Sequence, residues 1–313
     1  MTTDNTTVLA KFNGLCAEQG LLGRRDGMED SDRIDGITDD TTLLRFLQAN
    51  HMDLSTALRQ FQEATKFHRT RNVARLYDLI SVHDFEDTRQ LYPHWTGRRD
   101  SRGLPILMID MAHLDQAAMV HWRETTEIPS QDACTDGGKI TPDMEQRASV
   151  LHDYITRFVF PLCSAMKDRP ETSTPISRSV YVVCNAPSYF SRMWSFLKKF
   201  VDPVTANKIA VLKSADVYGT LNQYISHDNI PTQFGGGFRF SNGMLPDLCP
   251  AIQQAMHWSN PSSKTLPPGP IKWKENGHGR IVIATGTANG VRRATELASL
   301  VEIKAKKSDV LLN

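Results

Sequence analysis

The sequence predicts an α/β protein, in which an all-helical N-terminal module precedes a domain built on a mainly parallel sheet flanked by helices. Three observations support this prediction. Apolar residues recur at helical spacing near the N-terminus, short unbroken apolar runs follow, and helical segments separate those runs. Strands that alternate with helices are typical of parallel sheets with crossover connections.

The first elements of the chain are predicted to be helical. Residues 1–37 are polar and rich in glycine, so we expect a flexible arm with at most a short helix at residues 8–15. Thr38 is followed by acidic residues, which is typical of a capped helix start. Asp53 is expected to cap a second helix, whose apolar residues fall on one face. We therefore place a helical module at residues 38–85.

Three apolar runs predict the strands. Residues 104–111 follow a turn and are apolar almost without interruption, which is typical of a strand buried on both faces. Residues 180–184 and 209–212 predict two further strands. A long amphipathic helix at residues 143–167 precedes these two strands, and Pro161 is expected to interrupt it near its end.

The last part of the chain has weaker patterns. After the three glycines at 235–237 the sequence becomes loop-rich, and residues 281–284 predict one late edge strand. These patterns divide the chain into a flexible arm (1–37), a helical module (38–85), an α/β domain (86–240) and a loop-rich C-terminal extension (241–313).

Composition and charge exclude several functional classes. Lys plus Arg number 36 and Asp plus Glu number 35, so the basic excess of a typical nucleic-acid binder is absent. No window of about 18 apolar residues is long enough to cross a bilayer, and the N-terminus lacks a secretory-signal pattern. The five cysteines are odd in number, far apart and without a Cys-x-x-Cys pair, which favours a reducing cytosol.

The common catalytic signatures are missing from the sequence. It has no Gly-x-Ser-x-Gly elbow, and Gly137-Gly138-Lys139 lacks both the upstream glycine and the following hydroxyl residue of a phosphate loop. The histidines are scattered, and His113 and His121 come nearest to a metal-ligand spacing. We therefore expect no enzyme activity, no cofactor and no metal.

The segment from Tyr189 to Val201 is the most informative one. At 100° per residue its apolar and aromatic side chains occupy one continuous arc, and its cations and serines fill the rest. A core helix that covers the sheet is one interpretation. Three Phe, a Trp and a Tyr opposite three cations are also the composition of a helix that contacts lipid. Both interpretations hold if the helix covers an apolar cavity.

Four segments share a wider pattern. Residues 41–54 contain Leu-Leu-Arg-Phe-Leu, and residues 100–106 read Asp-Ser-Arg-Gly-Leu-Pro-Ile. Residues 185–209 join Asn-Ala-Pro-Ser-Tyr-Phe to Asp-Pro-Val-Thr-Ala-Asn-Lys, and residues 230–236 read Ile-Pro-Thr-Gln-Phe-Gly-Gly. In this order the set resembles the CRAL-TRIO family, the lipid-binding fold of phosphatidylinositol/phosphatidylcholine transfer proteins.

The resemblance implies a deep apolar pocket whose gate helix opens on membranes, so that one phospholipid can exchange for another. It places the headgroup phosphate at Thr205 and Lys208, together with Asn50 and His51, where inositol-lipid binders of the family carry an Arg-Lys pair. The loss of that pair removes a charged bidentate donor. The implied gate and membrane contacts are Tyr189, Phe190, Met193, Trp194, Phe196, Leu197 and Phe200.

The chain departs from the family pattern before the strand at 180–184. The family has another strand and crossover there, which need roughly a dozen residues besides the strand, whereas only residues 168–179, with two prolines, are present. We therefore expect a sheet with one strand fewer, with Met108 and Val182 in the same sheet, or else a shortened isoform or an imperfect gene model. The pocket is expected to be smaller or open beside residues 168–179.

The leading functional hypothesis is a cytoplasmic, peripheral membrane protein that binds phosphatidylinositol, phosphatidylcholine or another hydrophobic molecule and exchanges or presents it at membranes. Its partners would be the lipid and the membrane surface, and not nucleic acid. A lipid-responsive regulatory or adaptor protein, or a shortened isoform with impaired transfer, remains an alternative. An α/β enzyme would require convergent acids or histidines in a pocket.

Overall fold

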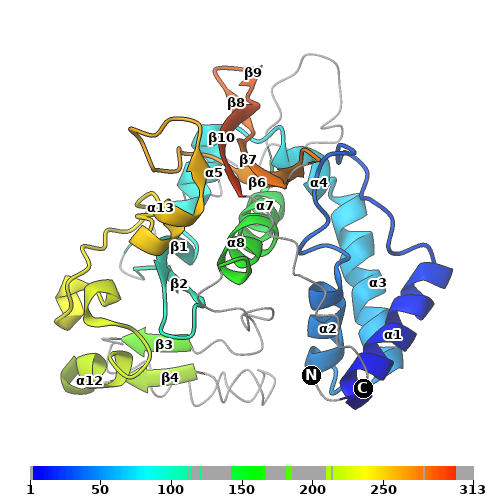
Figure 1. The fold of residues 1–313 in the computed structure, drawn as a ribbon, viewed down its shortest axis with the longest axis horizontal. Helices are drawn as coiled ribbons and strands as arrows, with labels where there is room; N and C mark the ends of the chain where they lie inside the picture. The colour runs from blue at the N-terminus through cyan, green and yellow to red at the C-terminus, as the bar shows by residue number, and fades with distance from the viewer. Residues whose placement is uncertain are drawn as a thin grey trace, which may run out of the picture.

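The fold is taken from a computed structural model of the whole chain (Figure 1). The structure describes residues 3–110, 142–166, 181–184, 209–212, 214–277 and 279–300, together with a few isolated positions between 111 and 141.

Three helices form the N-terminal module, and they pack on one another at one side of the molecule (Figure 1). They are α1 (Thr3–Glu18), α2 (Asp40–Ala49) and α3 (Leu54–Thr70). The flexible arm expected at residues 1–37 is therefore wrong for α1, which is longer than the short helix predicted at 8–15. Leu9, Phe12 and Cys16 follow a helical spacing and are buried against α2 and α3.

The predicted helix starts are confirmed to within a residue. The α2 helix begins at Asp40, with Asp39 rather than Thr38 as its N-cap residue. Asp53 caps α3, because its carboxylate accepts a hydrogen bond from the Thr56 backbone N–H at 2.8 Å. Two further helices, α4 (Val73–Tyr77) and α5 (Val82–Gln90), continue the chain.

The apolar run at 104–111 does not form a strand buried on both faces. It contributes β2 (Pro105–Met108), which is only partly buried and pairs antiparallel with β1 (His94–Arg99). Asp100 closes the hairpin, since its carboxylate accepts hydrogen bonds from the backbone N–H groups of Arg102 and Leu104 at 2.8 and 2.9 Å. The turn residues that precede the run therefore fold it back on its neighbour.

One long helix runs through the centre of the molecule, as predicted, and is interrupted before Pro161. It comprises α7 (Met144–Tyr154), a π-helical turn η2 (Ile155–Val159) and α8 (Phe160–Ser164). Proline has no N–H to donate to the preceding turn, so a local widening of the helix at this point is expected. Tyr154 and Phe158 from this helix lie in the largest hydrophobic core.

The strands predicted at 180–184 and 209–212 are confirmed as a parallel pair. They are β3 (Tyr181–Cys184) and β4 (Ile209–Leu212), with Tyr181 opposite Ile209 and Cys184 opposite Leu212. The other strand pairs among the described residues are antiparallel. The expectation of a mainly parallel sheet is therefore not met by these strands. Met108 and Val182 also lie in separate two-stranded sheets.

Between β4 and residue 250 the described chain forms short helical turns. They are η3 (Ser214–Asp216), α12 (Val217–Leu221), η4 (His227–Asn229) and η5 (Thr232–Phe234). The next helix is α13 (Pro250–Ala255).

The C-terminal region is a sheet rather than the loop-rich extension with one edge strand that the sequence predicted. Its strands, in the order β5-β10-β7-β6, are all paired antiparallel. The predicted edge strand at 281–284 is β7, which lies inside the sheet between β10 and β6. The elements are β5 (His257–Trp258), β6 (Ile271–Glu275), β7 (Arg280–Ala284) and β10 (Thr295–Leu300), with a small hairpin of β8 (Thr287–Ala288) and β9 (Val291–Arg292).

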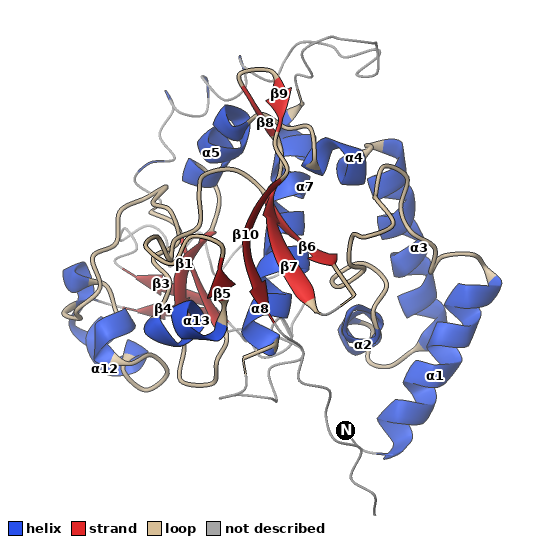
Figure 2. Cartoon of the chain, turned by 45° about the horizontal axis from the view of Figure 1, so that its top comes forward, coloured by secondary structure: helices blue, strands red, loops and turns tan. Residues whose placement is uncertain are grey.

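The C-terminal sheet packs on the central helix (Figure 2). The Trp273 ring lies 5.5 Å from the Phe158 ring, and its indole N–H donates a hydrogen bond to the Phe158 carbonyl at 3.1 Å. On the other face of β6, the Lys272 ammonium lies 2.7 Å from carboxylate oxygens of both Asp32 and Asp78. These contacts join the chain's first third to its last.

Candidate functional site

The α2–α3 turn carries two of the predicted headgroup residues. Asn50 ends α2, and its side-chain amide donates hydrogen bonds to the Phe46 carbonyl at 2.9 Å and to Gln60 Oε1 at 2.5 Å. His51 and Met52 both have positive φ angles, and the His51 side chain is exposed. The Asn50 donors therefore hold the turn together, and His51 alone offers solvent-facing nitrogens here.

The other predicted site residues lie between β3 and β4, outside the described residues. These are the gate residues Tyr189, Phe190, Met193, Trp194, Phe196, Leu197 and Phe200 and the headgroup residues Thr205 and Lys208. The described strands β3 and β4 flank this stretch. They form a parallel pair, with Tyr181 opposite Ile209 and Cys184 opposite Leu212.

The parallel pair packs against the segment that follows it. Val182 and Leu212 contact a small cluster whose buried members are Val217, Leu221 and Ile230. The Ile-Pro-Thr-Gln-Phe-Gly-Gly motif supplies part of this cluster and then folds back, with the Gly236 N–H bonded to the Pro231 carbonyl at 3.1 Å.

Gly236 is required by this fold-back. A Cβ atom at this position would lie 2.1 Å from the Ile230 carbonyl oxygen, which no side chain can accommodate. The motif thus closes the domain beside the parallel pair, and its role in the described structure is packing rather than chemistry.

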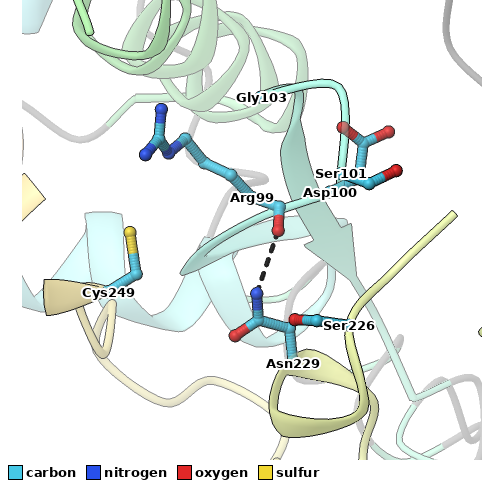
Figure 3. Close-up of a pocket in the computed structure, with 7 residues that line it drawn as sticks. All are labelled: Arg99, Asp100, Ser101, Gly103, Ser226, Asn229 and Cys249. Carbon is cyan, nitrogen blue, oxygen red and sulfur yellow. Dashed lines mark hydrogen bonds between the residues drawn. The ribbon is translucent and has the colours of Figure 1, made fainter. Parts of the chain in front are cut away.

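A polar cavity of about 160 Å³ lies between the Asp-Ser-Arg-Gly motif and the turn that precedes the Ile-Pro-Thr-Gln-Phe-Gly-Gly motif (Figure 3). It is bounded by the β1–β2 turn and the turn at Ser226–Asn229, and the Asn229 amide donates a hydrogen bond to the Arg99 carbonyl at 3.0 Å. Ligand pockets typically measure about 300–1,000 Å³, so the cavity is too small for a lipid. Its lining residues are Arg99, Asp100, Ser101, Gly103, Ser226, Asn229 and Cys249.

Two of the thiols that the structure describes, Cys16 and Cys184, are poor nucleophiles. Burial raises the pKa of Cys16 to about 11 and also raises the pKa of Cys184, which stands at the end of β3. Both are free thiols, and a raised pKa keeps them protonated near neutral pH. Within the described part of the chain, no group of three or more His, Cys, Asp or Glu side chains is arranged to hold a metal.

Sequence reasoning missed the buried ion pairs around Lys272. Asp78 also accepts a hydrogen bond from the Thr285 hydroxyl at 2.9 Å and pairs with the Arg292 guanidinium at 2.8 Å. No local signal could reveal this network, because Lys272 and Asp78 are 194 residues apart in the chain. Its polar groups satisfy one another, so the arrangement holds the fold together.

Comparison with known proteins confirms the family resemblance. The family model described as "CRAL/TRIO domain" matches residues 150–236, from the central helix through β3 and β4 to the closing glycines. Over these residues the chain is thus similar to domains of the CRAL-TRIO class. None of the described helices is long and apolar enough to cross a membrane.

The most similar relatives include proteins named for lipid transfer. The chain is 24% identical over 261 residues to the SEC14 cytosolic factor of Eremothecium gossypii, covering 71% of this chain and 76% of that protein. It is 25% identical over 243 residues to the Sec14 cytosolic factor of Schizosaccharomyces pombe, covering 71% and 82%. It is 23% identical over 203 residues to the phosphatidylinositol/phosphatidylcholine transfer protein SFH9 of Arabidopsis thaliana, covering 59% and 34%.

Proposed function

We propose that this protein binds a phospholipid or a similar hydrophobic ligand and exchanges or presents it at cytosolic membrane surfaces. The observation that carries the proposal is the match of residues 150–236 to the CRAL/TRIO domain, together with relatives named as phosphatidylinositol/phosphatidylcholine transfer proteins. No catalytic step is part of the proposal, because burying acyl chains requires only an apolar cavity and a way into it.

The proposed gate is the amphipathic segment at 189–200. The parallel register of β3 and β4 supports this assignment, since the chain between them has to cross back along the pair. A crossover whose aromatic face is turned toward an apolar cavity would cover the ligand. When it opens, the same aromatic face would enter the membrane interface. Each buried methylene of an acyl chain contributes about 0.8 kcal/mol, so two chains supply ample binding energy.

The proposed headgroup site combines Thr205 and Lys208 with the α2–α3 turn at Asn50 and His51. Lys208 would supply the positive charge for the lipid phosphate and Thr205 a hydroxyl donor. The Asn50 amide donors are already bonded to Phe46 and Gln60, so the turn adds little to phosphate binding. This favours a ligand held mainly by its acyl chains.

A lipid-responsive regulatory or adaptor role, or impaired transfer, is the second candidate. The observation that favours it is the absence of a continuous parallel sheet among the described strands, which form separate small sheets. Such a protein would retain bound lipid but move it slowly between membranes.

Two measurements separate these candidates. Native mass spectrometry of the purified full chain should detect a co-purified phospholipid at near one-to-one stoichiometry. Transfer of labelled phospholipid from donor to acceptor vesicles should then be measurable for a transfer protein and absent for an adaptor. If the protein carries no lipid and takes up none from vesicles, the proposed function is wrong.

The gate is tested by Trp194→Asp combined with Phe200→Asp. Each aromatic side chain moved from water into lipid or core contributes roughly 1.5–3 kcal/mol, so the double variant should lose most of its vesicle co-sedimentation while its circular dichroism is retained. Val291→Asp is the matched control, because Val291 is an apolar side chain on the β8–β9 hairpin with an exposed fraction of 68%. Equal co-sedimentation of the double variant and the wild type would contradict the gate.

A further inference from the structure

The helical module lies beside the central helix (Figure 1), and basic side chains from both gather around Asp153. Two contacts place Asp153 next to Arg157 and His68, and the influence of Asp153 on the pKa values of Arg25 and Arg45 indicates that these two arginines lie near it. The basic side chains come from the loop after α1, from α2, from α3 and from α7–η2. Together with one carboxylate, they are Arg25, Arg45, Arg157, His68, His152 and Asp153, hereafter the arginine cluster.

Arg157 and Asp153 form the buried floor of the cluster. Their side chains have exposed fractions of 5% and 4%, and the closest approach, from Arg157 Nη1 to Asp153 Oδ2, is 3.5 Å. This distance is too long for a good hydrogen bond. Arg157 Nε and Nη1 have no hydrogen-bond partner among the described residues, although the guanidinium lies 4.7 Å from the Tyr77 ring centre. Buried donors of this kind are normally satisfied.

Arg25 and Arg45 form the rim. Both are half-buried, and neither guanidinium donates a hydrogen bond to any residue that the structure describes. Burial lowers the pKa of Arg25; Asp153 opposes this effect, and Arg157 and Arg45 lower the pKa further. Burial also lowers the pKa of Arg45, against the opposing effect of Asp39 and Asp153.

His152 shows that the cluster is reached from solvent. Its side chain is exposed, yet burial lowers its pKa, with Asp153 opposing and Arg45 and Arg25 adding to the shift. The Arg25 and Arg45 side chains at the rim are only half-buried, so they too are reached by solvent. A small anion could therefore enter beside His152 and reach the guanidinium groups.

The carboxylates nearby do not balance the three guanidinium charges. Asp153 faces Arg157 and, at 3.8 Å, the His68 Nε2 atom. Asp39 already accepts hydrogen bonds from the Gly36 N–H at 2.7 Å and the Thr42 hydroxyl at 2.6 Å at the start of α2. The cluster thus holds unused donors and uncompensated positive charge, which is the complement of a dianion.

We propose that the arginine cluster binds a phosphate monoester group. Two negative charges and three terminal oxygens would accept hydrogen bonds from Arg25 and Arg45 at the rim and from Arg157 at the floor. The site is separate from the proposed headgroup residues Thr205 and Lys208 and does not depend on the proposed function. A soluble phosphorylated molecule and a monoester lipid headgroup carry the same chemistry.

Calorimetric titration of the full chain with inorganic phosphate, at constant ionic strength set by chloride, tests the site itself. Wild type should bind phosphate, and Arg45→Gln or Arg25→Gln should each weaken binding by about 10- to 100-fold. Arg59→Gln is the matched control, because Arg59 is an exposed arginine on α3. Its phosphate affinity should equal that of wild type.

Thermal unfolding without phosphate distinguishes binding from packing. Removing one of three like charges should leave the melting temperature of Arg45→Gln unchanged or higher, while the stabilisation by added phosphate is lost. A lower melting temperature of Arg45→Gln, with stabilisation by phosphate intact, would mean that the cluster only packs the helical module against the central helix. That outcome would overturn the proposal. Absence of phosphate binding in wild type, or equal binding in Arg45→Gln and Arg59→Gln, would also overturn the proposal.

Vesicle binding separates the two sources of the phosphate. Phosphatidylcholine vesicles containing phosphatidic acid present a monoester, and vesicles containing phosphatidylglycerol present only diesters. A preference for phosphatidic acid that Arg45→Gln abolishes identifies a lipid source; phosphate binding without that preference identifies a soluble one. Lys208→Ala should impair phospholipid transfer but leave the phosphate titration unchanged, so failure of the proposed function and failure of this site are distinguishable.

Discussion

The parallel pair β3–β4 is stabilised differently from the scaffold, by which we mean the central helix and the C-terminal sheet that packs on it. Among the described residues, the scaffold has the largest core, in which Phe158 and Trp273 are fully buried, and a buried ion network joins its two ends. The parallel pair rests on a small cluster centred on Val217, Leu221 and Ile230. The stabilising contacts of the described residues are therefore concentrated away from the proposed lipid site. A transfer protein needs local opening at that site.

The largest effect is expected from Lys272→Met. This change leaves Asp32 buried without its cation and Asp78 with only the half-exposed Arg292 as a partner, and breaking a buried pair costs about 3–5 kcal/mol. Chemical denaturation should show this loss, whereas Lys264→Met, at an exposed position, should leave the free energy of unfolding unchanged. A loss below about 1 kcal/mol, the range of a surface pair, would mean that the network does not hold the scaffold together.

The next prediction compares the two cores directly. Phe158→Ala should lower the free energy of global unfolding by about 3–5 kcal/mol, because the Phe158 ring packs between Tyr154 and Trp273. Ile230→Ala removes a buried side chain from the small cluster. It should mainly raise the amide exchange of residues 214–236, with a smaller change in global unfolding. Equal global losses for both variants would contradict two separately stabilised regions.

Acid should weaken the packing of the helical module against the central helix. Burial lowers the pKa of His68 to about 4, whereas the unfolded chain has an ordinary histidine pKa of about 6.5. The unfolded state then binds more protons between these values, so the stability contributed by neutral His68 is lost as the pH falls from about 6.5 toward about 4. Urea denaturation of wild type and His68→Gln should show this as a pH-dependent difference, on the order of 2 kcal/mol.

The pH series of wild type and His68→Gln also tests whether His68 titrates with folding. If the stability difference between wild type and His68→Gln is constant from pH 7 to pH 4, then His68 does not titrate with folding. His83→Gln provides the reference, because His83 is largely exposed on α5.

The smallest effect is expected at the headgroup. Lys208→Ala should reduce phospholipid affinity by about 10- to 100-fold through loss of one charge-assisted contact, and leave the denaturation midpoint unchanged. Fluorescence titration with a labelled phospholipid measures this directly, with Lys199→Ala as the control from the polar arc of the same segment. Equal loss in both variants would show a general charge effect rather than a headgroup contact.

The sequence predicted elements whose signals are local. Asp53 as a cap, the break before Pro161, and the strands β3 and β4 depend on residues within one turn or one apolar run. The C-terminal sheet was missed for a physical reason. In β6, the run Ile271-Lys272-Trp273 has only two apolar residues, so its strand signal is weak. Lys272 is buried with its neighbours, and its burial depends on carboxylates far away in the chain.

The candidate site also contains residues with a local sequence signal and residues without one. The family motifs identified the closing glycines, and the structure explains why Gly236 has to lack a side chain; the headgroup positions stay a prediction. The arginine cluster carried no sequence signal, since Arg25, Arg45 and Arg157 are isolated in the chain, on the loop after α1, on α2 and on η2. The apolar run at 104–111 misled because its hairpin partner, β1, has no apolar pattern of its own.

Hydrogen–deuterium exchange of the delipidated full chain, with and without phosphatidylcholine–phosphatidylinositol vesicles, tests the central claim most directly. Lipid uptake should slow amide exchange in residues 181–212, which hold β3, β4 and the chain between them, and leave β6 and β7 unchanged. Protection of β6 and β7 alone, or no protection anywhere at saturating lipid, would contradict the assignment of the lipid site to the parallel pair.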